Sequence, residues 1–537
     1  MRLRTDAFRA SVGNGVSSRA GSPVLLVGAS LLVAAVAWGF SAQIGRQFVD
    51  EQGRPMPPAY HDEYSYLFQA ETFLAGRTWF PSFEPRPELF DQMHVLNEGR
   101  FASRYFPGTG AWLTPFVAWA DPWLGQRVAH VLCAVLMLWI GSDLRGVVCG
   151  LTAGLLFALS PGLAVFSTLL LAHHPTLLGL LLFTWAFLRM RRTHWWWWAV
   201  LAGTGLSFAM LCRPMTAAGF GLPFGLWFAW FLSTGRSRPS EGTSVPDVSL
   251  LPAHPHSHSR HVTPEEGQTK PREEGLSPAK DRVPFSRRVG LAFALVAPLI
   301  AGIGVMLWYS STITDEPLVT PYQLYTDVYT PRHVYGFDNV VRGEQRLGPK
   351  VIDNYDQWAE NLTPALAVKN VGKRFITTLR LTLGIVPLTF ALLFLVLSRR
   401  LTGDGWLLLA AIISLQAVHI PYWFSGIMDW HYVLESAPCW LLLCGMATAE
   451  LFRAGPVAAS RLIRGWWLAI LGTAVLVNSV TVPLPSDPEQ PWLLWRGRAP
   501  QRVAELRFAR SAYADVRNRI DELRRGAPAV LLVIPVP

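Results

Sequence analysis

The chain has 537 residues, of which 51% are hydrophobic and only 16% are charged. A soluble globular protein carries charge on about a quarter of its residues, so the composition excludes that class and favours a protein with many membrane spans. The net charge of +10 does not indicate nucleic-acid binding, because the arginines gather at the ends of apolar blocks, as in the cytoplasmic loops of membrane proteins.

The first apolar block, 23–43, follows the basic start MRLRTDAFRA. Its length approaches the about 20 residues with which a helix crosses a bilayer, and no small-residue cleavage site of a signal peptide follows it. We therefore expect a retained membrane helix that leaves residues 1–22 in the cytoplasm. It leads to a polar extracytoplasmic loop at 44–106.

The stretch YHDEYSYLFQAETFLAGR, residues 60–77 of that loop, predicts a short amphipathic helix. Two prolines precede it, apolar residues recur at helical spacing, and Gly76 ends it. Asp62 and Glu63 stand at its beginning, where acids also suit an N-cap and the positive end of the helix dipole. An acid pair on a short helix at the membrane surface equally suits a site that removes a proton from a group arriving from water.

Further apolar blocks predict the remaining spans, and several of the early ones are short. We expect these spans at about 107–121, 125–141, 147–160, 162–173, 175–190, 195–211, 215–233, 288–309, 376–397, 404–423, 431–450 and 466–482. If these spans cross the membrane in alternating directions from a cytoplasmic N-terminus, the strongest basic clusters all fall on the cytoplasmic side. The expected fold is an all-α polytopic membrane protein with about 11–13 transmembrane helices, since one or two short blocks could be re-entrant.

Besides residues 1–22 and the first loop at 44–106, three longer segments lie outside these spans. Residues 234–287, which separate a transmembrane region at 23–233 from another at 288–482, lack apolar periodicity and predict a disordered cytoplasmic linker. Residues 310–374 form a second large extracytoplasmic loop. The extracytoplasmic tail at 483–537 has helical composition over 500–525 and one predicted buried strand at 527–536.

Under this topology, polar residues from distant parts of the chain face one aqueous compartment. They are Arg104, Tyr105, His173, His174, Arg213, Arg332 and His431. Ionisable groups at membrane depth are costly and mark a pathway or a site, although an Arg at a helix end also snorkels to lipid headgroups. The five cysteines lack metal-ligand spacing, and no convincing ligand set is present, so we expect no cofactor while a divalent metal stays possible.

Five stretches of the sequence, in their order along the chain, resemble a known family. The acid pair at the head of the first loop is similar to that of the GT-C fold glycosyltransferases that use polyprenyl-phosphate sugars, such as the protein O-mannosyltransferases and the aminoarabinose and galacturonic acid transferases acting on lipid A. The matching stretches are HDEYSYLFQAETFLAGR, GRFASRYFPGTGAWLTPF, FALSPGLAVFSTLLLAHHP, LCRPM and DWHYVLESAPCWLLL. The insertion at 234–287 departs from compact members, and His431-Tyr432 stands where many relatives carry an Arg-Tyr pair.

The resemblance implies transfer of a sugar from a polyprenyl phosphate to a hydroxyl of a glycan, lipid or protein, with inversion, outside the plasma (inner) membrane. Asp62 matches the family's general base, and Glu63 would orient the acceptor or Asp62. The donor phosphate would be bound by arginines, with histidines and a tyrosine as further candidates. These residues are Arg104, Arg213, Arg332, His173, His174, His431 and Tyr105.

Two other functions stay open. The many spans and the polar residues at membrane depth also suit a transporter or lipid flippase without bond chemistry, although the two repeated halves typical of transporters are not visible in the sequence. An oligosaccharide polymerase or ligase is a neighbouring enzyme class, for which the loop at 310–374 is the place to look.

Overall fold

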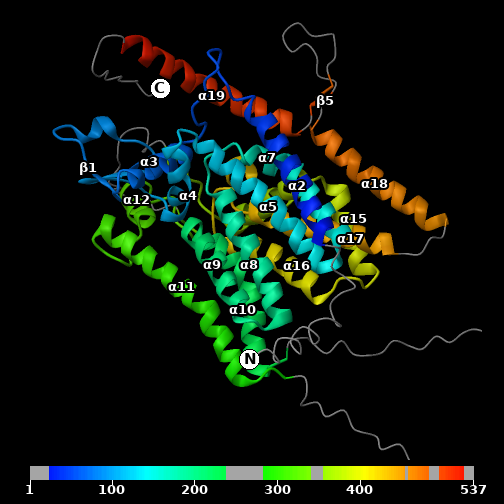
Figure 1. Cartoon of the computed structure of the whole chain (residues 1–537). Coiled ribbons are helices and arrows are strands. Elements are labelled where there is room, and N and C mark those ends of the chain that lie inside the picture. The colour runs from blue at the N-terminus through cyan, green and yellow to red at the C-terminus, as the bar shows by residue number, and fades with distance from the viewer. Residues whose placement is uncertain are drawn as a thin grey trace, which may run out of the picture.

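The computed structural model describes residues 23–236, 282–339, 355–453, 458–479, 481–482, 495–496 and 498–524. The expectations for residues 1–22, for most of the linker at 234–287 and for the strand at 527–536 fall outside these ranges. Helices dominate the described chain (Figure 1), which confirms the all-α class.

The helices follow one another in the order of the apolar blocks. They are α2 (Pro23–Gly45), α3 (His61–Leu74), α4 (Pro107–Ala118), α5 (Pro122–Arg145), α6 (Val147–Ala158), α7 (Pro161–Phe166), α8 (His173–Thr193), α9 (Trp196–Cys212), α10 (Pro214–Thr234), α11 (Phe285–Thr314), α12 (Pro321–Tyr329), α14 (Pro364–Thr382), α15 (Ile385–Leu397), α16 (Gly403–Val418), α17 (Ala437–Arg453), α18 (Ala458–Ser479) and α19 (Arg498–Leu523), with the 3-10 turns η1 (Pro87–Phe90), η2 (Ile427–Asp429) and η3 (Leu434–Ser436). The described strands are short. In the first loop β1 (Phe80–Pro81), β3 (Arg100–Ser103) and β2 (Val95–Asn97) pair antiparallel in that order, and β4 (Thr481–Val482) pairs with β5 (Trp495–Arg496).

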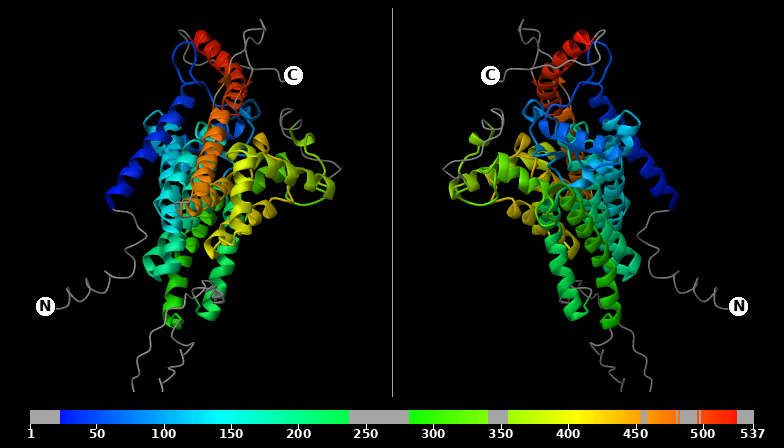
Figure 2. Two further views of the ribbon diagram at one scale, coloured as in Figure 1. Left: turned by 90° about the vertical axis from the view of Figure 1, so that its right-hand side faces the viewer. Right: turned by 90° about the vertical axis from the view of Figure 1, so that its left-hand side faces the viewer.

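The long helices lie side by side in one bundle (Figure 2). Six helices in the described ranges are long and apolar enough to cross a membrane, and a seventh span is added if the pair α14–α15, bent by 98°, counts as one. The shorter apolar helices α6, α9 and α16 pack within the same bundle. The chain is therefore an integral membrane protein.

The bundle has one end that is rich in paired arginines, which we call the basic end. There Arg189 lies 2.7 Å from Asp143, and Glu450 accepts from Arg453 at 2.8 Å and lies 3.2 Å from Arg145. These residues stand near the C-terminal ends of α5, α8 and α17. We call the opposite end, where α8 begins and α9 ends, the site end.

The predicted span at 107–121 is wrong. Helix α4 begins at the site end, where Gly110 N donates to Gln69 of α3 at 3.1 Å. It ends just before α5, whose first turns are also at the site end, since Gln126 donates to the Leu171 carbonyl at 3.0 Å. Both ends of α4 thus lie on one side of the bundle, and the helix does not cross it.

The predicted span at 162–173 is also wrong. Helix α7 has six residues, about 9 Å at 1.5 Å per residue, and all six are buried inside the protein. Helices α5 and α8 run parallel, because His130 contacts His174 near their beginnings and Asp143 pairs with Arg189 near their ends. Because neither α4 nor α7 crosses the bundle, α5 and α6 run in the direction opposite to the one predicted, and α8 keeps its predicted direction.

Helix α6 packs against α5 through small residues. A Cβ atom at Gly150 would overlap the Leu138 carbonyl and the Ser142 hydroxyl of α5, and one at Gly154 would lie 3.1 Å from the Ala134 carbonyl. Glycines four residues apart allow two membrane helices to approach this closely.

The close contact between α5 and α6 predicts that Gly150→Ala lowers the free energy of unfolding by about 1–3 kcal/mol, because an added methyl group must displace backbone. The matched control is Gly225→Ala in α10, where a Cβ meets nothing within 4 Å. Thermal melting of the detergent-solubilised proteins measures both changes. Equal melting temperatures for the two variants would contradict this packing.

The site end is covered by the segments outside the bundle. The first loop carries α3 and the three-stranded sheet, and the second carries α12. Leu96 and Ala102 of the sheet pack in one buried cluster with Tyr325 and Tyr329 of α12, so the two loops form a single cap. Helix α19 lies at the same end of the molecule (Figure 1), where it packs against α7.

Candidate functional site

Asp62 stands in the first turn of α3, on the cap side of the site end. Its side chain is 20% exposed, and its Oδ2 lies 3.6 Å from His94 Nε2. The Tyr105 hydroxyl donates to its Oδ1. Burial and the negative charge of Asp62 raise the pKa of Tyr105, which keeps this hydroxyl protonated. The Asp62 carboxyl group is therefore fixed by Tyr105, while part of it remains exposed to solvent.

His94 adds no positive charge beside Asp62. Its side chain is only 4% exposed, and burial and the nearby Arg104 lower its pKa well below the usual value. A neutral imidazole contacts the carboxylate without pairing its charge.

Glu63, the other acid of the pair, does not face the same space as Asp62. It is fully buried, and its Oε2 accepts from the backbone N–H groups of Ala59 at 2.8 Å and Tyr60 at 3.2 Å, which fixes the start of α3. Its Oε1 accepts from Leu170 N at 2.8 Å and lies 3.6 Å from Arg510 Nη2 of α19. Burial raises the pKa of Glu63, while Arg510 and the N–H groups act against that rise. The contacts of Glu63 are therefore internal to the protein.

Arg104 is a buried cation beside Asp62's partner Tyr105. The residue is 6% exposed, and its guanidinium lies over the rings of Tyr322 at 4.5 Å, Tyr325 at 4.8 Å and Tyr105 at 5.3 Å. Among the described residues no acid pairs with this guanidinium, and its Nε has no acceptor. A cation–π contact contributes about 0.5–2 kcal/mol, less than the several kcal/mol that burial of an unpaired ion costs. The surroundings of Arg104 thus favour an anion.

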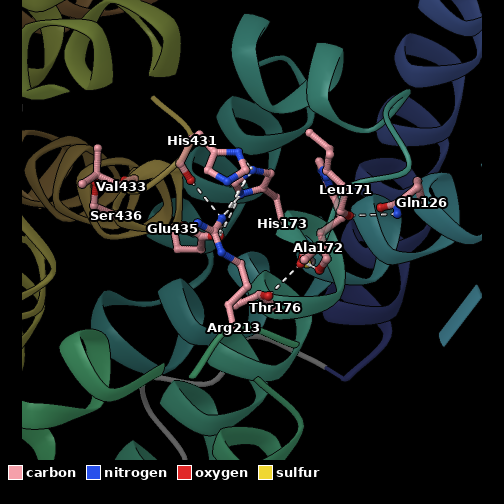
Figure 3. Close-up of polar contacts among 12 residues, drawn as sticks. Gln126, Leu171, Ala172, His173, Thr176, Arg213, His431, Val433, Glu435 and Ser436 are labelled. Atoms are coloured by element: carbon pink, nitrogen blue, oxygen red, sulfur yellow. Dashed lines mark hydrogen bonds and ion pairs between the residues drawn. The ribbon is translucent and has the colours of Figure 1, made fainter. Parts of the chain in front are cut away.

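A second polar cluster lies where α8 begins and α9 ends (Figure 3). His173 Nδ1 lies 2.9 Å from Glu435 Oε1, and His173 Nε2 lies 3.1 Å from His431 Nδ1. Arg213 Nη1 donates to the same Glu435 oxygen at 3.0 Å and to the His431 carbonyl at 2.9 Å. The charge of Asp62 acts on both His173 and His431, so the two groups lie at the same end of the bundle.

Glu435 was not among the predicted site residues. It is fully buried and pairs with the charge of Arg213. The signal that could have found it is its place in the sequence, since an acid inside the stretch DWHYVLESAPCW must have a partner at membrane depth.

Two predicted residues lie apart from this space. His174 contacts His130 at 3.1 Å between α8 and α5. The Arg332 side chain lies 3.6 Å from Asp356, which also accepts from the Arg332 N–H at 3.0 Å. The structure therefore joins Asp62, Tyr105 and Arg104 in one group and Arg213, His173 and His431 in a second group at the same end of the bundle. Glu63, His174 and Arg332 lie in other surroundings.

A groove of about 960 Å³ lies at the far end of α3 from Asp62. Phe73, Arg77 and Trp79 line one side, and Trp308 and Tyr309 of α11 line the other. Within the described ranges no group of three or more His, Cys, Asp or Glu residues could hold a metal ion.

No protein-family model matches the chain, and no curated protein matches it. Among solved structures, the chain is similar to an oligosaccharyltransferase of Archaeoglobus fulgidus, crystallised with a tethered acceptor peptide that contains the NVT sequon. The TM-score is 0.48 at 13% identity, and the match covers 95% of this chain and 59% of that one. The chain thus spans about 59% of the length of that protein. A likeness at this level concerns the course of the helices and says nothing of substrate or mechanism.

The unpaired charge of Arg104 predicts that Arg104→Met leaves the melting temperature of the free protein unchanged or raises it, because removing an uncompensated buried ion removes a cost. The matched control is Arg374→Met. Arg374 is also buried, but it donates to the carbonyls of His419 at 2.6 Å, Tyr422 at 3.1 Å and Phe424 at 2.5 Å. Its loss leaves those acceptors unsatisfied, at about 1–3 kcal/mol each, so this control should melt earlier. A stronger fall for Arg104→Met than for Arg374→Met would refute the anion site.

Proposed function

We propose that the protein is an inverting glycosyltransferase that moves a sugar from a polyprenyl phosphate to an acceptor hydroxyl. The observation that carries the proposal is a partly exposed carboxyl group, Asp62, bonded to Tyr105, while Arg104, the residue before Tyr105, holds a buried guanidinium that pairs with no acid among the described residues. A base and an anion-seeking cation that both contact Tyr105 suit a reaction that takes a proton from a hydroxyl and releases a lipid phosphate.

In this reaction the acceptor hydroxyl lies against the free side of the Asp62 carboxylate. As its oxygen attacks the anomeric carbon, the proton passes to Asp62, and the bond between that carbon and the phosphate oxygen breaks. The bonding electrons leave with the lipid phosphate, whose growing negative charge is stabilised by Arg104. Displacement from one face inverts the anomeric configuration. Tyr105 fixes the carboxylate through its hydrogen bond.

Arg213 and its neighbours have a different role in this proposal. Because Glu435 already pairs with the charge of Arg213, this cluster attracts a phosphate less strongly than Arg104 does. It suits a hydroxyl of the sugar through His431, because His173 is buried and both of its ring nitrogens are engaged within the protein. Glu63 holds Asp62 in place rather than contacting the acceptor, since its oxygens are engaged within the protein. Arg332 and His174 have no place in the reaction.

The orientation belongs to the same proposal. Basic residues accumulate on the cytoplasmic side of membrane proteins, so the basic end would lie in the cytoplasm and the site end outside the plasma (inner) membrane. The acceptor would then be a glycan, a lipid or a protein of the cell envelope. A divalent metal is not needed, because a cation next to the leaving group is already supplied by Arg104.

Asp62→Asn is expected to reduce transfer by about 10²- to 10⁴-fold, the contribution of a general base. The assay measures release of polyprenyl phosphate from a radiolabelled donor by purified protein. The matched control is Asp327→Asn, since Asp327 is an exposed acid of α12 in the same cap. An Asp62→Asn protein that releases polyprenyl phosphate at the wild-type rate would exclude the base. If the protein instead moves the intact donor across the membrane of a vesicle without cleaving the donor, it is a flippase.

A further inference from the structure

Helix α19 docks on the first loop through several charged pairs. Arg517 lies 2.7 Å from Asp50 and donates to the Pro55 carbonyl at 2.8 Å, and Asp521 accepts from Arg54 at 2.9 Å. These contacts are partly exposed, and surface ion pairs contribute only about 0–1 kcal/mol each. They connect α19 to the beginning of the first loop.

Arg510 of α19 is different, because it is buried. Its side chain is 2% exposed, its Nη2 donates to the Thr168 carbonyl at 2.9 Å, and the same atom lies 3.6 Å from Glu63 Oε1. Its guanidinium also lies 4.3 Å from the centre of the Phe48 ring. A buried guanidinium thus meets a buried carboxylate, and neither charge is stable there without the other.

Glu63 is the point at which three segments of the chain meet. It binds the N–H groups that precede α3, the N–H of Leu170 in the segment before α8, and Arg510 of α19. Asp62 is its neighbour in the sequence, and His173 follows Leu170 by three residues. A shift of the Glu63 carboxylate would therefore move both sides of the candidate site relative to one another.

We propose that Arg510 is a positioning residue, which acts through Glu63 to hold Asp62 and the beginning of α8 in the arrangement that the reaction needs. Helix α19 is then part of the catalytic unit and not a separate tail. This inference rests on the proposed function, because its readout is the rate of sugar transfer. A misplacement of about 1 Å at a reacting group can reduce a rate by about 100-fold.

The experiment uses the full-length protein and the polyprenyl phosphate release assay. Arg510→Met should lower kcat by about 10- to 100-fold and change KM for the donor by less than about threefold, because it removes no contact to the substrate. Glu63→Gln alone should also lower kcat, because its amide NH2 group replaces an oxygen that accepts from a backbone N–H. In Arg510→Met combined with Glu63→Gln the loss should be smaller than the product of the two single losses, since both changes disrupt the same contact. Arg519→Met is the matched control, because Arg519 is exposed on the same helix and pairs with Glu522.

Arg510→Lys serves as a second test if Arg510→Met does not fold. Lysine keeps the charge but replaces the planar guanidinium, whose Nη2 meets Thr168 and Glu63 and whose plane lies against Phe48, with a compact ammonium group. A smaller loss of kcat is therefore expected. An unchanged kcat in the folded fraction of Arg510→Met, or of Arg510→Lys where only that variant folds, would reduce Arg510 to a structural contact and overturn the inference. The inference is also overturned if the losses of Arg510→Met and Glu63→Gln multiply in the double variant, as for two independent sites. If Asp62→Asn also transfers at the wild-type rate, the proposed function itself fails, which is a separate result.

Discussion

The constraint on which this structure depends is the cost of burying charge away from water. Glu63 is held by three backbone N–H groups and Arg510, Glu435 pairs with Arg213, and Arg374 donates to several carbonyls. Each of these groups is buried because partners are provided. Arg104 is also buried, but within the described chain it has aromatic faces around it and no acid. Arg104, the exception, contacts Tyr105, which also binds Asp62, the more exposed acid of the pair.

The candidate site is assembled from segments that are far apart in the sequence. Asp62 and Arg104 come from the first loop, the tyrosines above Arg104 come from α12, and the second cluster comes from α8, α9 and the segment before α17. The bundle holds these segments at one end, and the cap with α19 closes over them. Such a site depends on many long-range contacts, so its geometry is a property of the whole chain.

The sequence predicted the start of α3 and its acid pair correctly because the signals are local. Prolines precede the helix, apolar residues follow its period, and Gly76 after its end has a φ of 70°. The spans at 107–121 and 162–173 were wrong for a physical reason: every residue of α7 is apolar or small because the protein buries it, and hydropathy does not distinguish a protein interior from lipid.

The different roles of Asp62 and Glu63 were also beyond the sequence. Neighbouring residues of a helix point about 100° apart, and which of the two faces the interior depends on the segment at 168–170 and on α19. The contact between Arg510 and Glu63 joins residues more than 400 positions apart in the chain. A charged pair of this kind has no period and no motif, so composition predicted the helix but not its docking.

The central claim is that the leaving phosphate and the base share one space. A cryo-EM structure of the protein with polyprenyl phosphate tests it most directly. The account predicts phosphate density within hydrogen-bonding distance of the Arg104 guanidinium, with the free side of the Asp62 carboxylate facing the same space. Phosphate density in the groove between Trp79 and Trp308, with Arg104 still contacting only tyrosine rings, would contradict it.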